Sequence, residues 1–135
     1  MDEQEIDDRL AQAFGSQVNK WFFAKVAGVS RENWDGVARA AVIEECEEGD
    51  LLELVREPDN SYDSNAVMVL RRPDGAQLGY LDQRAAAEVS QDTGRGRFIW
   101  LAILAHHNFH PDTNAVVGAT IALARLPILP EDFQS

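Results

Sequence analysis

The segment from Pro58 to Asn65, with the sequence PDNSYDSN, combines the residue types of a rigid recognition loop. Half of its side chains are short amides or carboxylates, which can hydrogen-bond nearby backbone amides and fix the shape of a loop. These are Asp59, Asn60, Asp63 and Asn65. Tyr62 adds an aromatic face that suits stacking. The segment therefore predicts a binding surface, although the same residues would also suit a loop that only braces itself over a packed tyrosine.

Calcium binding is a weaker interpretation of this loop. Acceptor side chains alternate along it as they do in an EF-hand. However, Ser64 stands where that motif needs glycine, and Leu70 stands where it needs a bidentate acid. We therefore expect no calcium site.

A second set of metal-ligand residue types lies in the sequence HHNFHPD, which contains His106, His107 and His110. Alternation along a strand would send His106 and His107 to opposite faces. The three imidazoles would converge only if the strand ended at Ala105. A polar strand end followed by a turn is the simpler interpretation, and we expect no metal there.

No combination of residues predicts catalysis. The sequence contains no nucleophile beside a base, no glycine loop that would cradle a phosphate and no paired carboxylates in an apolar setting. Its single cysteine, Cys46, excludes disulfides within the chain and is expected to be a small buried apolar residue. We therefore expect a binding protein that uses no cofactor.

Length and composition fit one intracellular domain. The chain has 135 residues, of which 45% are hydrophobic and 26% charged, as is ordinary for a single folded core. No stretch approaches the roughly 18 apolar residues of a membrane span. The opening sequence MDEQEIDDRL is acidic where a secretory signal would be basic and then apolar. A cytoplasmic protein without membrane contact is the expectation.

The net charge of −11 argues against a nucleic-acid partner, because binding to phosphates depends on lysine and arginine. The acidic residues are unevenly placed, however. Residues 1–15 hold five acids against one arginine, and residues 44–53 hold six acids and no base. A local basic face remains open, and its candidates are Lys20, Lys25, Arg31, Arg71, Arg72, Arg84, Arg95 and Arg97.

Three helices are expected. Apolar residues at helical spacing over residues 6–14, with acids in the first turn, predict an amphipathic helix at the N-terminus. An alanine-rich helix follows an Asp82 cap and runs to about Gln91, before Gly94 and Gly96. Between them, a helix is expected from an Asn33 cap to about residue 46. Its inward-facing residues would be Trp34, Val37, Ala41 and Val42.

Six strands are expected where β-branched and aromatic residues are bounded by turn residues. Their ranges are 21–29, 51–56, 66–71, 77–81, 97–106 and 115–126, and Arg72-Pro73-Asp74-Gly75 supplies a hairpin turn between the third and fourth. The predicted fold is mainly β with flanking helices, of the α+β class: a six-stranded antiparallel, partly open barrel. The barrel would occupy residues 21–126, between a helix and connector over 1–20 and a tail over 127–135.

Three stretches together resemble the HIRAN family. They are KVAGVS at residues 25–30, GDLLELVREPDNSYDSNAVMVL at residues 49–70 and GAQLGYL at residues 75–81, so the resemblance spans roughly residues 22–125. A VREPDN-x-YD-x-NA segment feeding a strand, followed by a G-x-x-L-G-Y-L strand, is an uncommon combination. HIRAN modules occur in replication-fork remodelling helicases and as free-standing bacterial proteins. The resemblance implies an OB-like barrel of the free-standing bacterial type.

The resemblance also implies a binding site. The best understood eukaryotic members bind the 3′ end of single-stranded DNA, stacking bases on aromatic side chains and bonding the terminal sugar hydroxyl. The recognition loop of the family corresponds here to Asn60, Tyr62 and Asp63, and the ring position after the hairpin glycine corresponds to Tyr80. Asn60 and Asp63 would bind the strand terminus, while the two tyrosines would supply stacking faces.

The chain departs from the family pattern after its first strand. End-binding members carry adjacent aromatic residues there, whereas this chain has Ser30, Arg31 and Glu32. The change removes a stacking platform and places an acid near the expected phosphates. Arg31 could compensate in part, because a guanidinium can stack on a base and pair with a phosphate. Arg84 is also expected near the site.

Two functions remain open from the sequence. The loop favours a nucleic-acid-binding module for single-stranded DNA, with its 3′ end as a candidate target, in DNA repair or replication-fork processing. A helicase or a nuclease would then be a candidate partner. The charge favours a non-catalytic protein-interaction module, in which the acidic segment over residues 44–53 docks a basic partner.

Overall fold

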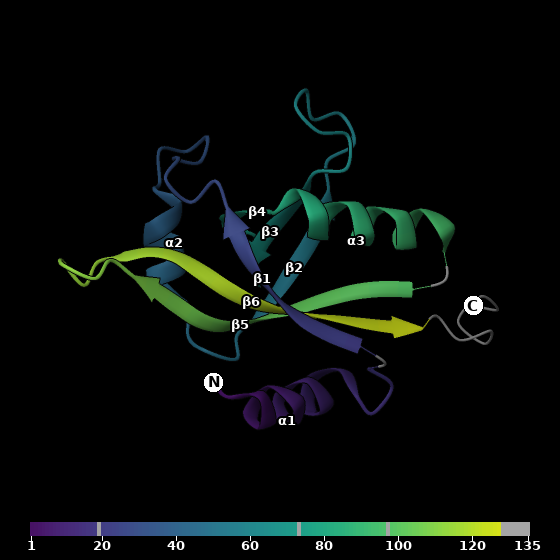
Figure 1. The fold of residues 1–135 in the computed structure, drawn as a ribbon. Coiled ribbons are helices and arrows are strands. Elements are labelled where there is room, and N and C mark those ends of the chain that lie inside the picture. The colour runs from purple at the N-terminus through teal and green to yellow at the C-terminus, as the bar shows by residue number, and fades with distance from the viewer. Residues whose placement is uncertain (19, 73, 97, 128–135) are drawn as a thin grey trace.

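The computed structural model describes residues 1–18, 20–72, 74–96 and 98–127, and it contains all of the predicted helices and strands (Figure 1). The helices are α1 (Glu3–Phe14), α2 (Arg39–Glu45) and α3 (Gln83–Arg95). The strands are β1 (Lys20–Ala27), β2 (Leu51–Arg56), β3 (Val67–Arg71), β4 (Gln77–Leu81), β5 (Phe98–Phe109) and β6 (Val116–Pro127). Pro73 of the predicted turn, Arg97 and residues 128–135 of the predicted tail lie outside the described residues.

The strands form an antiparallel barrel in the order β1-β4-β3-β2-β5-β6, and the barrel is closed. β1 pairs with β6 from Lys20 to Lys25 and then with β4 only at Val26 and Ala27. β2 pairs with β5 only at Leu51 and Leu52. The predicted antiparallel, OB-like barrel of six strands is confirmed, but it is closed rather than partly open. The long strands β5 and β6 pair with each other, and they close the barrel because β6 also pairs with β1 and β5 also pairs with β2.

The junction of β1 with β4 requires glycine at position 79. A Cβ atom built on Gly79 would lie 2.3 Å from the carbonyl oxygen of Ala27 and 2.7 Å from Cγ1 of Val26. No side chain fits in that space, because the nearer atom belongs to the backbone. Gly79 thus lets the two strands approach, and it places the next residue, Tyr80, opposite Ala27 in the ladder.

Two apolar clusters stabilise the fold. The larger fills the barrel and includes Ala85, Ala86 and Val89 of α3, which lies above the strands in Figure 1. The smaller joins Ile6 and Leu10 of α1 to the outer surface of β5 and β6. α1 is therefore the predicted amphipathic helix. No helix among the described residues is long and apolar enough to cross a membrane.

α3 begins as predicted and ends later than predicted. The Asp82 carboxylate accepts a hydrogen bond from the amide of Ala85 at 2.9 Å, which caps the helix. The helix continues through Gly94 and ends at Gly96, whose φ of 69° is the left-handed conformation common after helices. Gly94 alone does not stop the helix, because an interior glycine costs only about 1 kcal/mol.

The prediction for the segment after β1 is wrong in part. Asn33 does not cap α2, which begins only at Arg39. Residues 33–37 instead form a tight turn, in which Gly36 has a φ of 84° and the Asp35 carboxylate accepts from the amide of Val37 at 3.0 Å. This local bonding competes with a helix. Of the residues expected to face inward, Val42 is buried, whereas Trp34, Val37 and Ala41 are exposed.

Cys46 is buried, as the sequence predicts, with 3% of its surface exposed. Burial raises the pKa of its thiol, because the thiolate loses contact with water. The thiol donates to the carbonyl of Val42 in α2 at 3.3 Å. Cys46 is thus a packed residue at the end of α2.

An ion pair fixes the hairpin between β3 and β4. The Arg71 guanidinium donates to both carboxylate oxygens of Asp74, at 3.1 and 2.5 Å, and also to Glu45 at 2.7 Å. The bonds from Arg71 to Asp74, together with one from the amide of Ala76, lower the pKa of Asp74 from 3.8 to about 2. Gly75 follows with a φ of 76°, which suits the predicted turn.

The Asp74 carboxyl is therefore expected to titrate near pH 2 in the folded protein. Because the folded pKa is below the ordinary value, the ion pair stabilises the fold above about pH 3.8, and its contribution disappears as the pH falls through about 2. Carbon-detected NMR titration of Asp74 measures this directly. Arg71→Gln should return the midpoint toward 3.8, and an unchanged midpoint in that variant would show that Arg71 is not the cause.

Candidate nucleic-acid interface

The loop between β2 and β3 is braced by its own side chains. The carboxamide oxygen of Asn60 accepts from the amides of Tyr62 and Asp63, at 2.9 and 3.1 Å. The carboxamide nitrogen of Asn60 donates to the Glu57 carboxylate at 2.6 Å. The Asp63 carboxylate accepts from the amide of Asn65 at 2.8 Å. The predicted local bonds are present, so the loop has a defined shape.

Further contacts tie this loop to the barrel and to α3. The backbone carbonyl of Asn65 accepts from the Ser90 hydroxyl of α3 at 3.0 Å. The Tyr80 hydroxyl, from β4, donates to the Glu57 carboxylate at 3.1 Å. Glu57 thus receives hydrogen bonds from both the loop and β4, and the loop is held beside the middle of α3.

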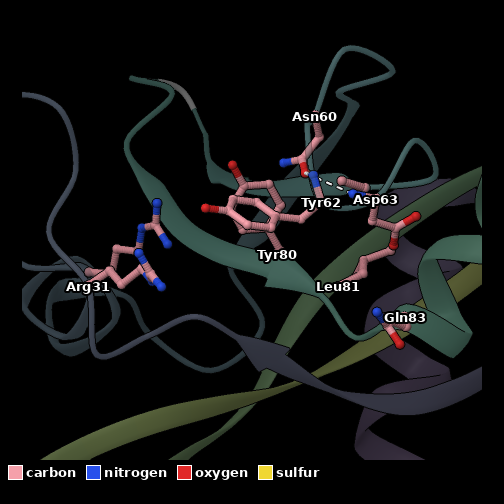
Figure 2. Close-up of a pocket in the computed structure, with 9 residues that line it drawn as sticks. Arg31, Asn60, Tyr62, Asp63, Tyr80, Leu81 and Gln83 are labelled. Atoms are coloured by element: carbon pink, nitrogen blue, oxygen red, sulfur yellow. Dashed lines mark hydrogen bonds between the residues drawn. The ribbon is translucent and has the colours of Figure 1, made fainter.

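Tyr62 projects from this braced loop and is 96% exposed. The alternative that its ring packs beneath the loop is therefore wrong. Figure 2 shows the phenol groups of Tyr62 and Tyr80 pointing to the same side, toward Arg31. An exposed aromatic ring leaves apolar surface in contact with water, which is unfavourable. The hydrogen bonds from the amides of Tyr62 and Asp63 to Asn60 fix the loop backbone and so keep the ring exposed.

A pocket of about 380 Å³, here called the tyrosine pocket, adjoins Tyr62 and Tyr80. Its volume is within the usual range for small-ligand sites, about 300–1,000 Å³. It combines parts of the chain that are distant in sequence: the segment after β1, α2, the β2–β3 loop, β4 and the start of α3. Its lining residues are Arg31, Arg39, Asn60, Tyr62, Asp63, Ala66, Tyr80, Leu81 and Gln83. The structure therefore brings five of the six predicted site residues together: Asn60, Tyr62, Asp63, Tyr80 and Arg31.

Arg84 is the predicted site residue that does not line this pocket. It lies at a separate hollow of about 490 Å³ that also includes Lys20, Phe22 and Glu88. Successive residues of an α-helix point about 100° apart, so the neighbouring Gln83 takes the place expected for Arg84. Arg84 thus lies outside the lining of this pocket but is adjacent in sequence to a residue that lines it.

The sequence reasoning missed Arg39, the first residue of α2. Arg39 is only 8% exposed, and its guanidinium carbon lies 5.4 Å from the centre of the Tyr80 ring. A signal was present, because Val42 and Ile43 follow at three and four residues and both are buried. A charged residue that shares a helix face with buried apolar residues indicates a side chain with a specific partner or role.

Arg31 lies across the pocket from the loop (Figure 2). Its side chain is exposed, and its guanidinium has no hydrogen-bond or ion-pair partner in the described part of the chain. Two guanidiniums and one carboxylate, that of Asp63, thus line the pocket. The lining carries one net positive charge, although the whole chain carries −11.

The three histidines do not converge. β5 continues to Phe109, so His106 and His107 lie on opposite faces as predicted for a continuous strand. The His106 ring lies 5.9 Å from that of Phe23, and Nε2 of His107 lies 2.8 and 3.0 Å from two carbonyl oxygens at the end of α2. Nδ1 of His110 accepts from amides of the β5–β6 turn. Among the described residues, no group of three or more ligand-type side chains is placed to hold a metal ion.

Comparisons with known proteins agree with this architecture. The crystal structure of the HIRAN domain of human HLTF is 17% identical, with a TM-score of 0.59, and the match covers 84% of this chain and 80% of that chain. The crystal structure of a Lactobacillus plantarum protein is 22% identical, with a TM-score of 0.60, and the match covers 78% of this chain and 92% of that chain. No curated protein matches the chain.

The comparison with protein families is the more specific result. The model of the HIRAN domain matches residues 21–116, which is most of the chain. The matched range contains every residue that lines the tyrosine pocket, whereas α1 lies outside it. From the family match and the shared barrel we conclude that the chain belongs to the HIRAN family.

Proposed function

We propose that this chain binds single-stranded DNA at the pocket beside Tyr62, with the 3′ end of the strand as its target. HIRAN domains are nucleic-acid-binding modules, so membership of the family supports a DNA-binding role. The observation that carries the finer proposal is the exposed Tyr62 ring, held by a braced loop at the edge of a pocket that contains a second tyrosine. Stacking on such rings tolerates any base sequence.

Asp63 is the residue best suited to bind the terminal hydroxyl. One of its carboxylate oxygens accepts from the amide of Asn65, and the other has no partner in the described ranges of the chain. A free carboxylate oxygen accepts a hydrogen bond from a hydroxyl group, and its negative charge repels a phosphate. Asn60 has a different role, because its carboxamide oxygen is already bonded to two loop amides and so shapes the loop.

The same proposal limits what the chain does with the DNA. A domain that holds a strand end by stacking and hydrogen bonds performs no chemistry on it. We therefore propose a non-enzymatic module in DNA repair or replication-fork processing, acting with a helicase or a nuclease that supplies the catalytic step.

A second candidate function rests on another surface. Trp34 is 99% exposed and adjoins a hollow of about 460 Å³ with Met68 and Leu70 among its lining residues and Asp35 and Asp74 beside them. Apolar lining residues with an acid beside them suit a protein segment that carries apolar and basic residues. Asp35 is the acid that would meet such a segment, because Asp74 is already paired with Arg71. This arrangement favours the protein-interaction function, and it leaves the tyrosine pocket free for DNA.

Fluorescence anisotropy of labelled oligonucleotides tests the proposed function. We expect a strand with a 3′ hydroxyl to bind about ten-fold or more tightly than the same strand with a 3′ phosphate, because the phosphate would lose the hydrogen bond to Asp63 and be repelled by it. The absence of binding at low salt would exclude DNA as the ligand. Equal binding of the two strands would retain DNA and exclude recognition of the 3′ end.

A further inference from the structure

We propose that Arg39 is the phosphate-binding residue of the tyrosine pocket and that, with Arg31, it holds one phosphodiester group. The inference deepens the proposed function and rests on it for the identity of the ligand as DNA.

The environment of the Arg39 guanidinium is that of a cation without its anion. The side chain is 92% buried, yet no carboxylate oxygen lies within 4.0 Å of it among the described residues. Its Nε donates to the carboxamide oxygen of Asn33 at 2.9 Å, and Nη1 donates to the carbonyl of Gly28 at 3.0 Å. Both acceptors are neutral. Burying an uncompensated charge is unfavourable, so an anion in the adjoining pocket would remove that cost.

The guanidinium also retains hydrogen-bonding capacity for such an anion. Arginine has five N–H donors, and the two bonds to Asn33 and Gly28 use two of them. Arg39 lines the pocket, so the remaining donors are the ones a ligand there would meet. A guanidinium can form two parallel hydrogen bonds to two oxygens of one phosphate, which holds the phosphate more firmly than the compact charge of a lysine does.

The fold fixes this guanidinium before any ligand arrives. Asn33, which accepts from Arg39, also donates to the backbone carbonyl of Gln77 in β4 at 2.9 Å. At Gly28, whose φ is 72°, an added Cβ would approach Nη1 of Arg39 to 3.1 Å. The turn after β1 and the edge of β4 thus hold the side chain beside Tyr80. A group held in place in this way loses little entropy on binding.

The charge of the pocket indicates which phosphate it accepts. The positive charges of Arg31 and Arg39 and the negative charge of Asp63 together give the lining one net positive charge. A phosphodiester carries one negative charge and neutralises it. A terminal phosphate monoester carries about two near neutral pH and would leave the pocket negative. The structure therefore favours an internal phosphodiester next to a hydroxyl end.

The first test is the salt dependence of oligonucleotide binding. In Arg39→Gln, we expect about ten-fold or more weaker binding at low salt, and a slope of log K against log salt that is smaller by about 0.7, as for the loss of one phosphate contact with a single strand. Arg39→Lys should keep the wild-type slope, because the charge remains. Arg95→Gln, which removes an exposed arginine from the last turn of α3, should change neither quantity. An unchanged slope in Arg39→Gln would overturn the proposal.

The second test does not depend on DNA or on the folding of a variant. Dimethyl phosphate, the diester group alone, is titrated into the wild-type chain while the side-chain Nε–H signals of the arginines are followed by NMR. A saturable shift confined to Arg39 and Arg31 supports the proposal. No shift, or shifts of the same size at Arg95, would overturn it. A shift with dimethyl phosphate but no binding of oligonucleotides would reject the proposed function while the phosphate site stands.

Discussion

Replacing Tyr62 by alanine is expected to weaken binding of a 3′-hydroxyl oligonucleotide by roughly 5- to 150-fold, because stacking on an aromatic side chain is worth about 1–3 kcal/mol per base. The free energy of unfolding should change by less than about 0.5 kcal/mol, because Tyr62 is 96% exposed and so contributes little to the packed core. Anisotropy gives the first quantity, and urea unfolding gives the second. A loss of binding without a loss of stability identifies a contact residue.

Trp34→Ala is the matched control for this experiment. Trp34 is as exposed as Tyr62, at 99%, but it adjoins the hollow beside Met68 rather than the tyrosine pocket. We expect the affinity for the oligonucleotide to stay within two-fold of wild type, a difference of about 0.4 kcal/mol. If Trp34→Ala weakened binding and Tyr62→Ala did not, the DNA would lie on the wrong surface for this account.

Replacing Gly79 by alanine is expected to lower the free energy of unfolding by about 3 kcal/mol or more, a large effect for the addition of one methyl group. The new Cβ would lie 2.3 Å from the Ala27 carbonyl oxygen, so β1 and β4 would have to separate where they pair only at Val26 and Ala27. Urea unfolding followed by circular dichroism measures the loss. The variant should also bind DNA less tightly, since Tyr80 is the next residue.

Gly118→Ala provides the control for this substitution. Gly118 is a buried glycine of β6, and a Cβ there would meet only the Asn108 side chain, at 3.6 and 3.8 Å, which is ordinary contact. We expect a change within about 0.5–1 kcal/mol, because alanine restricts the unfolded chain and fits the available space. Equal losses in the two variants would mean that the contact between β1 and β4 is not what requires glycine at position 79.

The barrel was predictable because its signals are local. Runs such as the one in β2 and the Asp74-Gly75 turn before β4 show their structure within a few residues. Closure of the barrel was not predictable, since it depends on pairings between strands distant in sequence, such as Leu52 with Ala102. The predicted helix around Trp34 is absent for a local reason, because the turn at Asp35 and Gly36 competes with helix formation. The sequence does not show which of the two local preferences is stronger.

The candidate site was predictable to the same extent. Asn60, Tyr62 and Asp63 lie in one short loop, and the bonds that brace it run between near neighbours. The spacing to Val42 and Ile43 marks Arg39 as a residue on a buried helix face, but its place in the pocket depends on the long-range packing of α2 beside β4. Gln83 rather than Arg84 lines the pocket, because one residue along a helix changes the direction of the side chain by about 100°.

The most direct test of the central claim is to map the bound strand by NMR. An isotope-labelled chain is titrated with a short oligothymidine that ends in a 3′ hydroxyl, and the backbone amide shifts are followed. We predict that the largest shifts occur at Tyr62, Asp63 and Tyr80, with little change at Trp34 or over residues 44–53. Shifts confined to the surroundings of Trp34 or to that acidic segment would contradict the assignment of the tyrosine pocket as the DNA-binding site.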